Sequence, residues 1–222
     1  MTRATEDLRI EPDGRFAEPR CLREDRGAVI PEFALVAPII VVFMLIVFEF
    51  GFAYRQTIDL ESAVRAAARQ TTNLGDQRGA DYLALQSFWS SMAKTKRVTI
   101  DRLVIYRTTA LNGDPTNSAC LTTNATPSGQ GLSGHCNIFG LTQLQTMVPA
   151  NFDNLTGTTC SASSWDRFWC PTSRKANQSD PPDYVGVYAR VNYSPVTRLY
   201  WSSSVAFNDR AVMRIEPKVS QP

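Results

Sequence analysis

One long apolar segment divides the chain into a leader and a domain. It covers residues 27–54, and the sixteen residues between Glu32 and Glu49 carry no charge. At about 1.5 Å per residue, these sixteen residues reach about 24 Å along a helix. Apolar residues on both sides extend the segment towards the thickness of a bilayer core, which is about 30 Å. The pattern predicts one membrane-spanning helix over residues 28–54.

The predicted membrane helix has a defined start and an expected kink. Gly27 is a helix breaker just before the first helical residue, Ala28. Pro38 lies in the interior, where it removes one backbone hydrogen bond and predicts a kink. Glu49 follows Glu32 by seventeen residues, or about 25 Å along a helix. We therefore interpret Glu49 as an ordinary interfacial residue, with the two carboxylates framing the hydrocarbon layer.

A helical pattern continues beyond the apolar segment. Small and apolar residues recur with the spacing of one helix face, namely Leu60, Ala63, Val64, Ala67, Ala68 and Thr71. Gly75 suits the C-terminal cap of such a helix. Residues 55–75 are therefore predicted to form an amphipathic continuation of the membrane helix that packs on a domain.

Residues 76–222 are predicted to form that domain. The expected elements are helices at 81–93 and 138–147 and strands at 97–106, 185–193, 199–207 and 211–216, with a turn at Asn208-Asp209. Residues 112–136 are expected to be loop because they are rich in Gly, Asn, Ser, Thr and Pro. The predicted fold class is α+β: a long N-terminal helix, followed by an antiparallel sheet that packs one face against it.

Charge suggests an orientation and excludes one class of partner. The formal net charge is +2, and no basic patch is interleaved with aromatic residues, so no nucleic-acid partner is expected. Four Arg residues of the leader, residues 1–27, come shortly before the apolar segment, against Arg55, Arg65 and Arg69 beyond it. This bias predicts a cytoplasmic leader and an extracytoplasmic domain, joined by a single pass through the plasma membrane.

The cysteines support export of the domain. Four of the five follow the apolar segment, and among their three pairings the sequence neighbours are favoured: Cys120 with Cys136 and Cys160 with Cys170. Both pairs would close loops rich in Gly, Ser and Thr. Disulfides persist in an oxidising compartment, which is consistent with an extracytoplasmic domain.

Catalytic, metal and cofactor chemistry find little support. His135 is the single histidine and lies next to Cys136 in an expected disulfide loop, so we interpret it as a solvated loop residue. No metal-ligand spacing, nucleophile elbow or phosphate-binding glycine loop occurs. We therefore expect a chain that is not an enzyme and has no catalytic residue, metal or cofactor.

One motif is specific. Residues 26–33, Arg-Gly-Ala-Val-Ile-Pro-Glu-Phe, are followed by the apolar run and resemble the class III signal of type IV pilins. Together with Glu49-Phe50-Gly51 and the helix over residues 63–69, they resemble the TadE/TadG-like family of the tight-adherence (Tad) pilus system. The resemblance covers residues 25–70, and residues 211–217 are similar to the closing strand of many such proteins.

This resemblance implies a pilin-like fold and a processing step. A prepilin peptidase would cut between Gly27 and Ala28, so that Glu32 becomes the fifth residue of the mature chain. Glu32 would then pair with the α-amino group of a neighbouring subunit while the apolar helices bundle. Because major subunits of this system are very small, the large domain implies a minor pilin or pseudopilin. Its partners would be the peptidase, other pilin and pilus-assembly subunits and membrane lipid, and its roles pilus assembly and adhesion.

Two alternatives come from other classes. Glu32 can also be an interfacial acid that reaches water from an uncut anchor, and the chain would then be a single-pass scaffold or surface adhesion domain of the same apparatus. A membrane-tethered extracytoplasmic enzyme is the third interpretation, because sites made only of acidic residues leave weak sequence traces.

Overall fold

The computed structural model describes residues 29–109, 112–126, 129–176, 181–198 and 200–216. The chain divides into two compact units, residues 1–42 and 43–222, and each is described by itself. Gly27, Ala28 and the rest of the predicted leader lie outside the described residues. In the first unit, the described residues 29–42 are helical throughout.

Helix α1 covers Val29–Leu74 and continues without interruption through Pro38. It is long and apolar enough to cross a membrane. Large apolar side chains are exposed in both units, including Phe33 and Ile39 in the first and Phe43 and Phe48 in the second. Such a surface needs an apolar environment, as the sequence pattern predicts.

Gly75 ends α1 as the sequence predicts. Its φ angle is +55°, which is costly for residues other than glycine. Its N–H donates to the Thr71 carbonyl at 3.0 Å, which satisfies one of the last free carbonyls of the helix. A Cβ at this position would lie 2.9 Å from Cγ2 of Ile215, so the close approach of the final segment also requires glycine.

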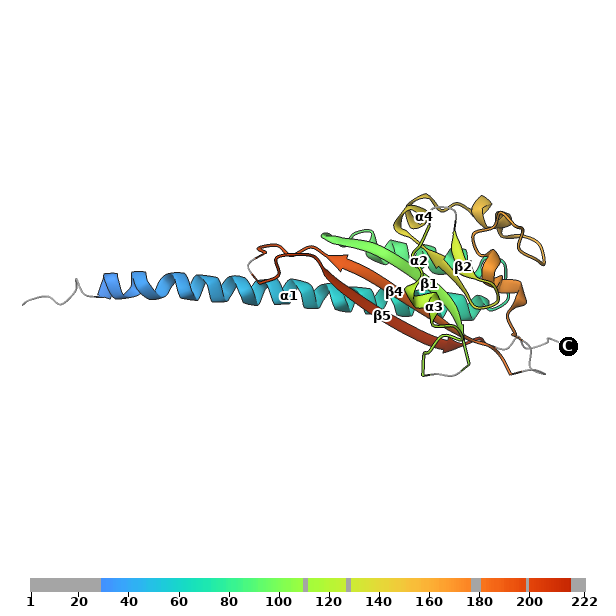
Figure 1. The fold of residues 1–222 in the computed structure, drawn as a ribbon, viewed down its shortest axis with the longest axis horizontal. Coiled ribbons are helices and arrows are strands. Elements are labelled where there is room, and N and C mark those ends of the chain that lie inside the picture. Colours follow the sequence, from blue (N-terminus) through green and yellow to red (C-terminus); the bar gives the residue numbers. More distant parts are fainter. Residues whose placement is uncertain (1–28, 110–111, 127–128, 177–180, 199, 217–222) are drawn as a thin grey trace, which may run out of the picture. The chain divides into compact units, whose positions relative to one another are not determined.

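The domain contains a five-stranded antiparallel sheet in the order β2-β3-β1-β4-β5 (Figure 1). Its strands are β1 (Val98–Thr108), β2 (Gln130–Leu132), β3 (Cys136–Phe139), β4 (Tyr184–Tyr193) and β5 (Val205–Arg214). Each neighbouring pair runs antiparallel. The α+β prediction, with a long N-terminal helix before an antiparallel sheet, is confirmed.

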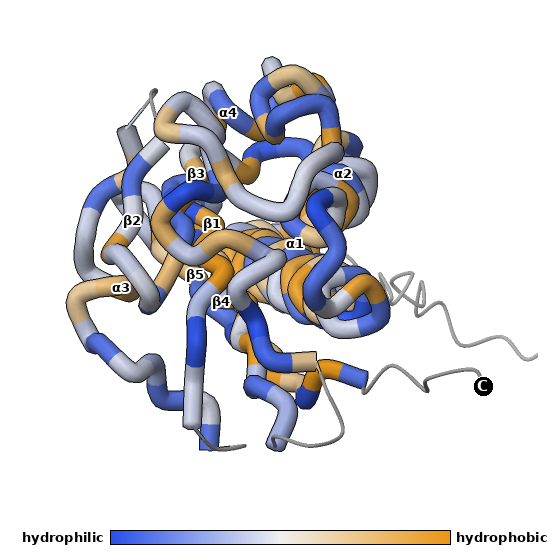
Figure 2. The backbone as a smooth tube through the Cα atoms, turned by 90° about the vertical axis from the view of Figure 1, so that its right-hand side faces the viewer, coloured by the Kyte–Doolittle hydropathy of each residue, from blue (hydrophilic) through white to orange (hydrophobic). Residues whose placement is uncertain are grey.

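The main core lies between the helices and one face of the sheet. The predicted face of α1, from Leu60 to Ala68, packs with helix α2 (Ala80–Met92) and with the inward residues of β4. Val185, Val187, Ala189 and Val191 are buried against this core, and apart from the buried Gly186 the residues between them are half-buried, so one face of β4 is apolar. Figure 2 shows α1 and α2 together on one side of the strands.

The opposite face of the sheet carries a smaller core. A register shift between Ile100 and Arg102 changes which residues of β1 face the helices. Val104 and Tyr106 therefore point to the other face, where they pack with Ile138 and both cysteines of one disulfide. The short helix α3 (Ala119–Thr122) carries Cys120 in this cluster. Strand β1 is thus buried on both faces.

Three expectations differ from the structure, one of them only in its bounds. Ile138 and Phe139 belong to β3, and the helix that follows, α4, covers only Leu141–Thr146. Residues 112–136 contain α3 and β2 as well as loop. Asn208 and Asp209 form no turn, because β5 runs through them in register with Arg190 and Ala189 of β4. The connection between β4 and β5 lies instead at residues 194–204, which we call the β4–β5 loop. Short 3-10 segments at Pro149–Leu155, Arg167–Trp169 and Pro171–Ser173 complete the described elements.

Candidate functional site

Glu32 lies in the first turn of α1, where a carboxylate interacts favourably with the helix dipole. Its residue is exposed, and it has no hydrogen bond or ion pair with any residue that the structure describes. The cleavage positions Gly27 and Ala28, which the sequence places beside it, lie outside the described residues. Among the described residues, no side chain or backbone group occupies the Glu32 carboxylate.

The four candidate cysteines form two bonds between sequence neighbours. Cys120 pairs with Cys136, and Cys160 pairs with Cys170. The first bond joins α3 to β3 within the smaller core. The second closes the loop before the 3-10 segment at Pro171–Ser173. The two bonds thus stabilise regions far from the membrane helix in the sequence.

Glu49 changes the interpretation of the junction between the membrane helix and the domain. Only 1 % of this residue is exposed. Its carboxylate accepts four hydrogen bonds from the end of β4 and the β4–β5 loop: Val196 N–H (2.7 Å), Thr197 N–H (2.8 Å), Thr197 Oγ1 (2.8 Å) and Tyr193 Oη (3.3 Å). Interpreting Glu49 as an ordinary interfacial residue is wrong, because its charge is satisfied by the domain.

An aromatic cluster adjoins the Glu49 site. The ring of Phe50 lies 5.1 Å from that of Tyr200 and 4.9 Å from that of Trp201, centroid to centroid. Tyr200 is 60 % exposed. Tyrosine and tryptophan are enriched where a membrane meets water, because their rings are apolar and carry a polar group. The loop thus brings two such side chains beside the end of the apolar run.

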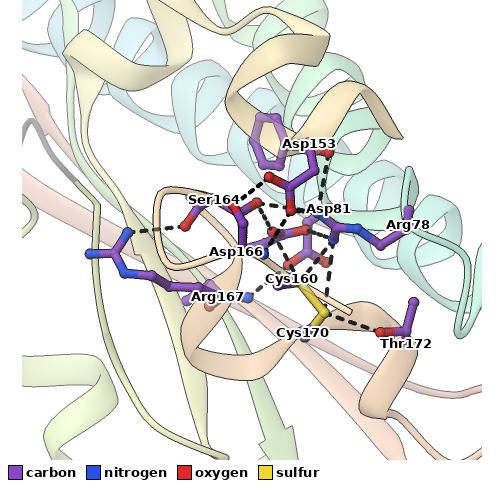
Figure 3. Close-up of polar contacts among 12 residues, drawn as sticks. Arg78, Asp81, Asp153, Cys160, Ser164, Asp166, Arg167, Cys170 and Thr172 are labelled. Carbon is purple, nitrogen blue, oxygen red and sulfur yellow. Dashed lines mark hydrogen bonds and ion pairs between the residues drawn. A yellow bond between two sulfur atoms is a disulfide. The ribbon is translucent and has the colours of Figure 1, made fainter. Parts of the chain in front are cut away.

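A second set of buried charges anchors the Cys160–Cys170 loop to the start of α2 (Figure 3). Arg78, whose side chain is 2 % exposed, donates to Asp166 Oδ2 at 2.7 Å and to Asp153 Oδ2 at 2.9 Å. It also donates to the Phe152 carbonyl and to Ser164 Oγ. Since Asp166 is fully buried, this guanidinium neutralises a carboxylate that water does not reach.

A neighbouring buried pair joins Arg174 to Asp81 of α2. Arg174 Nη2 lies 2.6 Å from Asp81 Oδ1, and both side chains are 0 % exposed. The Arg174 guanidinium also stacks 4.3 Å from the centroid of the Trp169 ring. Asn137 of β3 donates to Asp81 at 2.9 Å. The pair therefore ties together α2, β3 and the chain after the second disulfide.

The carboxyl of Asp153 provides a pH-dependent contribution to stability. Burial alone raises its pKa, but hydrogen bonds from Ser161 and the charge of Arg78 outweigh burial and lower the pKa below its usual value. A lowered folded-state pKa stabilises the fold above the unfolded pKa of about 3.9 and loses that effect as pH falls through the folded value. We expect the full chain in detergent to lose stability below about pH 4, and Asp153→Asn to weaken that dependence. Thermal unfolding across this pH range measures the dependence of stability on pH. Asp59→Asn, on α1, is the control. An equal change of melting temperature with pH in the wild type and in Asp153→Asn would contradict the role given to Asp153.

His135 lies in the turn between β2 and β3, as the loop interpretation expects. Its Nδ1 is 2.8 Å from Thr116 Oγ1. Within the described ranges, no three His, Cys, Asp or Glu side chains gather as a metal site requires. Asp166 and Asp81 each face an arginine, and their side chains are closed to solvent. Around Arg78 and Arg174, the described residues therefore offer no solvent-accessible pair of carboxylates of the kind that acid–base catalysis uses.

Sequence reasoning missed the buried sites of Arg78 and Arg174 and the role of Glu49. Glu49 carried a signal, since it is a lone charge next to a long apolar run. Its partners are about 150 residues away in the sequence, and two of the four donors are backbone N–H groups that leave no trace in residue identity. Nothing in the sequence around Arg78 and Arg174 separates them from solvent-exposed arginines, so only the fold shows that they are buried.

Comparison with known proteins finds a family match for the N-terminal part of the chain. Residues 27–69 match the family model described as TadE-like protein. The matched segment begins at Gly27 and ends within the part of α1 that packs on the sheet. The resemblance inferred from the sequence is thereby confirmed for this segment. No curated protein matches the chain, and no solved structure matches it.

Proposed function

We propose that this chain is a minor pilin or pseudopilin of a Tad-type pilus, processed by a prepilin peptidase between Gly27 and Ala28. The observation that carries the proposal is the TadE-like match over residues 27–69, which supports a component associated with a Tad pilus. The matched residues include a candidate membrane span and the helix face that packs on the domain.

Glu32 is the residue on which assembly depends in this proposal. A carboxylate close to the apolar layer is costly, up to about 2.5–3.5 kcal/mol at the centre of a bilayer, unless it is paired. The exposed Glu32 has no partner among the described residues. Cleavage creates an α-amino group on each neighbouring subunit, and this group supplies the missing positive charge and sets the axial register.

The exported domain acts through its surface in pilus assembly and adhesion, and it is not an enzyme. Two disulfides support an oxidising compartment for this domain, and the leader arginines support a cytoplasmic N-terminus. The buried, arginine-paired carboxylates of the Arg78 and Arg174 clusters support a structural role for those charges. The chain would prime, cap or modify the filament.

The mature N-terminus tests the processing step. The full chain is expressed in cells with and without a prepilin peptidase, and the first residue is determined by mass spectrometry. We expect Ala28 only when the peptidase is present. An N-terminus at Met1 in both cells would overturn the pilin proposal and favour the uncut single-pass scaffold.

A substitution at Glu32 tests the assembly step. We expect Glu32→Ala to be cut and inserted normally but incorporated into pili about 10- to 100-fold less, which corresponds to the loss of one charge-assisted hydrogen bond. Quantifying the chain in sheared pili and in membranes measures this effect. Glu61→Ala is the matched control, because Glu61 is a half-exposed glutamate of the same helix that pairs with Arg65. Normal incorporation of the Glu32 variant would contradict the pairing role.

A further inference from the structure

A cavity of about 580 Å³ lies beside α1 in the second unit, just beyond the apolar run. Phe52, Arg55, Gln56 and Asp59 of α1 line one wall. The rest of the lining comes from the chain between α2 and β1, residues 94–97, from Tyr193 at the end of β4 and from Val196 of the β4–β5 loop. The volume falls within the range of about 300–1,000 Å³ that is usual for small-ligand sites.

The cavity is strongly positive. Its lining has four basic residues, Arg55, Lys94, Lys96 and Arg97, and one acidic residue, Asp59, which leaves an excess of three positive charges. Asp59 is already close to Arg55, at 4.0 Å from its Nε. Lys94 and Lys96 are exposed and form no ion pair with any residue in the described part of the chain. Two lysine charges therefore remain available for an anion.

The position of the cavity along α1 matches the headgroup region of a membrane. Phe48, which is 63 % exposed, ends the uncharged run, and Phe52 of the cavity wall follows four residues later, or about 6 Å along the helix. The neighbouring cluster of Phe50, Tyr200 and Trp201 has the composition of a membrane–water boundary. A lipid headgroup in this region would lie at the level of the lysines.

We propose that this cavity binds the phosphate headgroup of an anionic phospholipid in the leaflet nearest the domain. The walls are fixed before a lipid arrives, because Glu49 holds the β4–β5 loop and the Arg97 carbonyl accepts the Ser194 N–H at 2.8 Å. Such preorganisation lowers the cost of binding. The site would hold the membrane-proximal end of the domain at headgroup level. The inference rests on anchoring by α1 and is independent of leader cleavage.

Native mass spectrometry of the full chain in detergent tests the lipid site. The chain is titrated with phosphatidylglycerol and, separately, with zwitterionic phosphatidylcholine. We expect the anionic lipid to bind more tightly, and Lys94→Gln/Lys96→Gln to lower its affinity by about 30-fold while leaving phosphatidylcholine binding unchanged. Because both lysines are exposed, circular dichroism should show an unchanged fold.

The control separates a specific site from general charge. Arg69→Gln/Arg214→Gln removes the same charge from exposed residues outside the cavity and should leave phosphatidylglycerol affinity unchanged. Equal loss in the two double variants, or equal affinity of the native chain for the two lipids, would overturn the proposal. Displacement of phosphatidylglycerol by inorganic phosphate would also overturn it, since the site would then serve a soluble anion.

Discussion

Replacing Arg174 with methionine is expected to lower the free energy of unfolding by about 3–5 kcal/mol, which is the usual effect of leaving one member of a buried ion pair alone. Arg174 and Asp81 are both fully buried, with 2.6 Å between Nη2 and Oδ1. Burial raises the pKa of Asp81, and the Arg174 charge opposes that rise. Without Arg174, the carboxyl must either stay charged in an apolar environment or take up a proton. A domain of ordinary stability, about 5–15 kcal/mol, would lose a large part of its margin.

Two further variants determine whether the loss comes from the unpaired charge. Arg174→Met/Asp81→Leu removes both charges and should recover most of the stability, because a well-packed apolar pair often replaces a buried ion pair without cost. Arg65→Met breaks an exposed pair on α1 and should cost less than about 1 kcal/mol. Denaturant unfolding of the full chain in detergent, with the disulfides intact, measures all three. A loss in Arg174→Met no larger than in Arg65→Met would contradict the argument.

Regular apolar periodicity is what made much of the fold predictable. The face from Leu60 to Ala68 lies in the core because its spacing matches a helix, and β4 alternates because one of its faces packs on the helices. Gly75 ends α1 because a left-handed residue is needed there. In each case, local sequence and tertiary packing favour the same structure.

Prediction failed where local preference and tertiary pairing disagree. Asn208 and Asp209 are typical turn residues, yet ten residues of β5 pair continuously with β4, and the ladder overrides the local preference. Ile138 and Phe139 belong to a short run buried on both sides, where periodicity does not distinguish a strand from a helix. The buried arginines and the partners of Glu49 are long-range contacts, so no local pattern identifies them.

The contrast between Glu32 and Glu49 shows how similar residues at the ends of one apolar run take different roles. Both are glutamates that border the same uncharged stretch, and the sequence alone does not distinguish their roles. Glu49 is satisfied within the domain, whereas Glu32 is exposed and has no partner among the described residues. A carboxylate already bound by four donors has little left to offer another subunit. Only Glu32 therefore suits an intermolecular contact.

Replacing Glu49 with alanine is expected to release the β4–β5 loop. The change leaves the N–H groups of Val196 and Thr197 without their acceptor, and losing hydrogen bonds to a charged group costs about 2–3 kcal/mol. Arg198 is an exposed residue of this loop, so trypsin cleavage after Arg198 reports on loop opening. If cleavage follows the open population, its rate should rise about 30- to 150-fold.

The matched control is again on α1. Glu61→Ala removes a half-exposed carboxylate whose partner, Arg65, is four residues away on the same helix, and it should leave cleavage after Arg198 unchanged. Glu49→Gln keeps the size of the side chain but places an amide N–H₂ where the loop also presents donors. It should therefore open the loop almost as much as alanine does, because one of the two oxygen acceptors is lost. Cleavage of Glu49→Ala at the wild-type rate would show that the aromatic contacts of Phe50 hold the loop without the carboxylate.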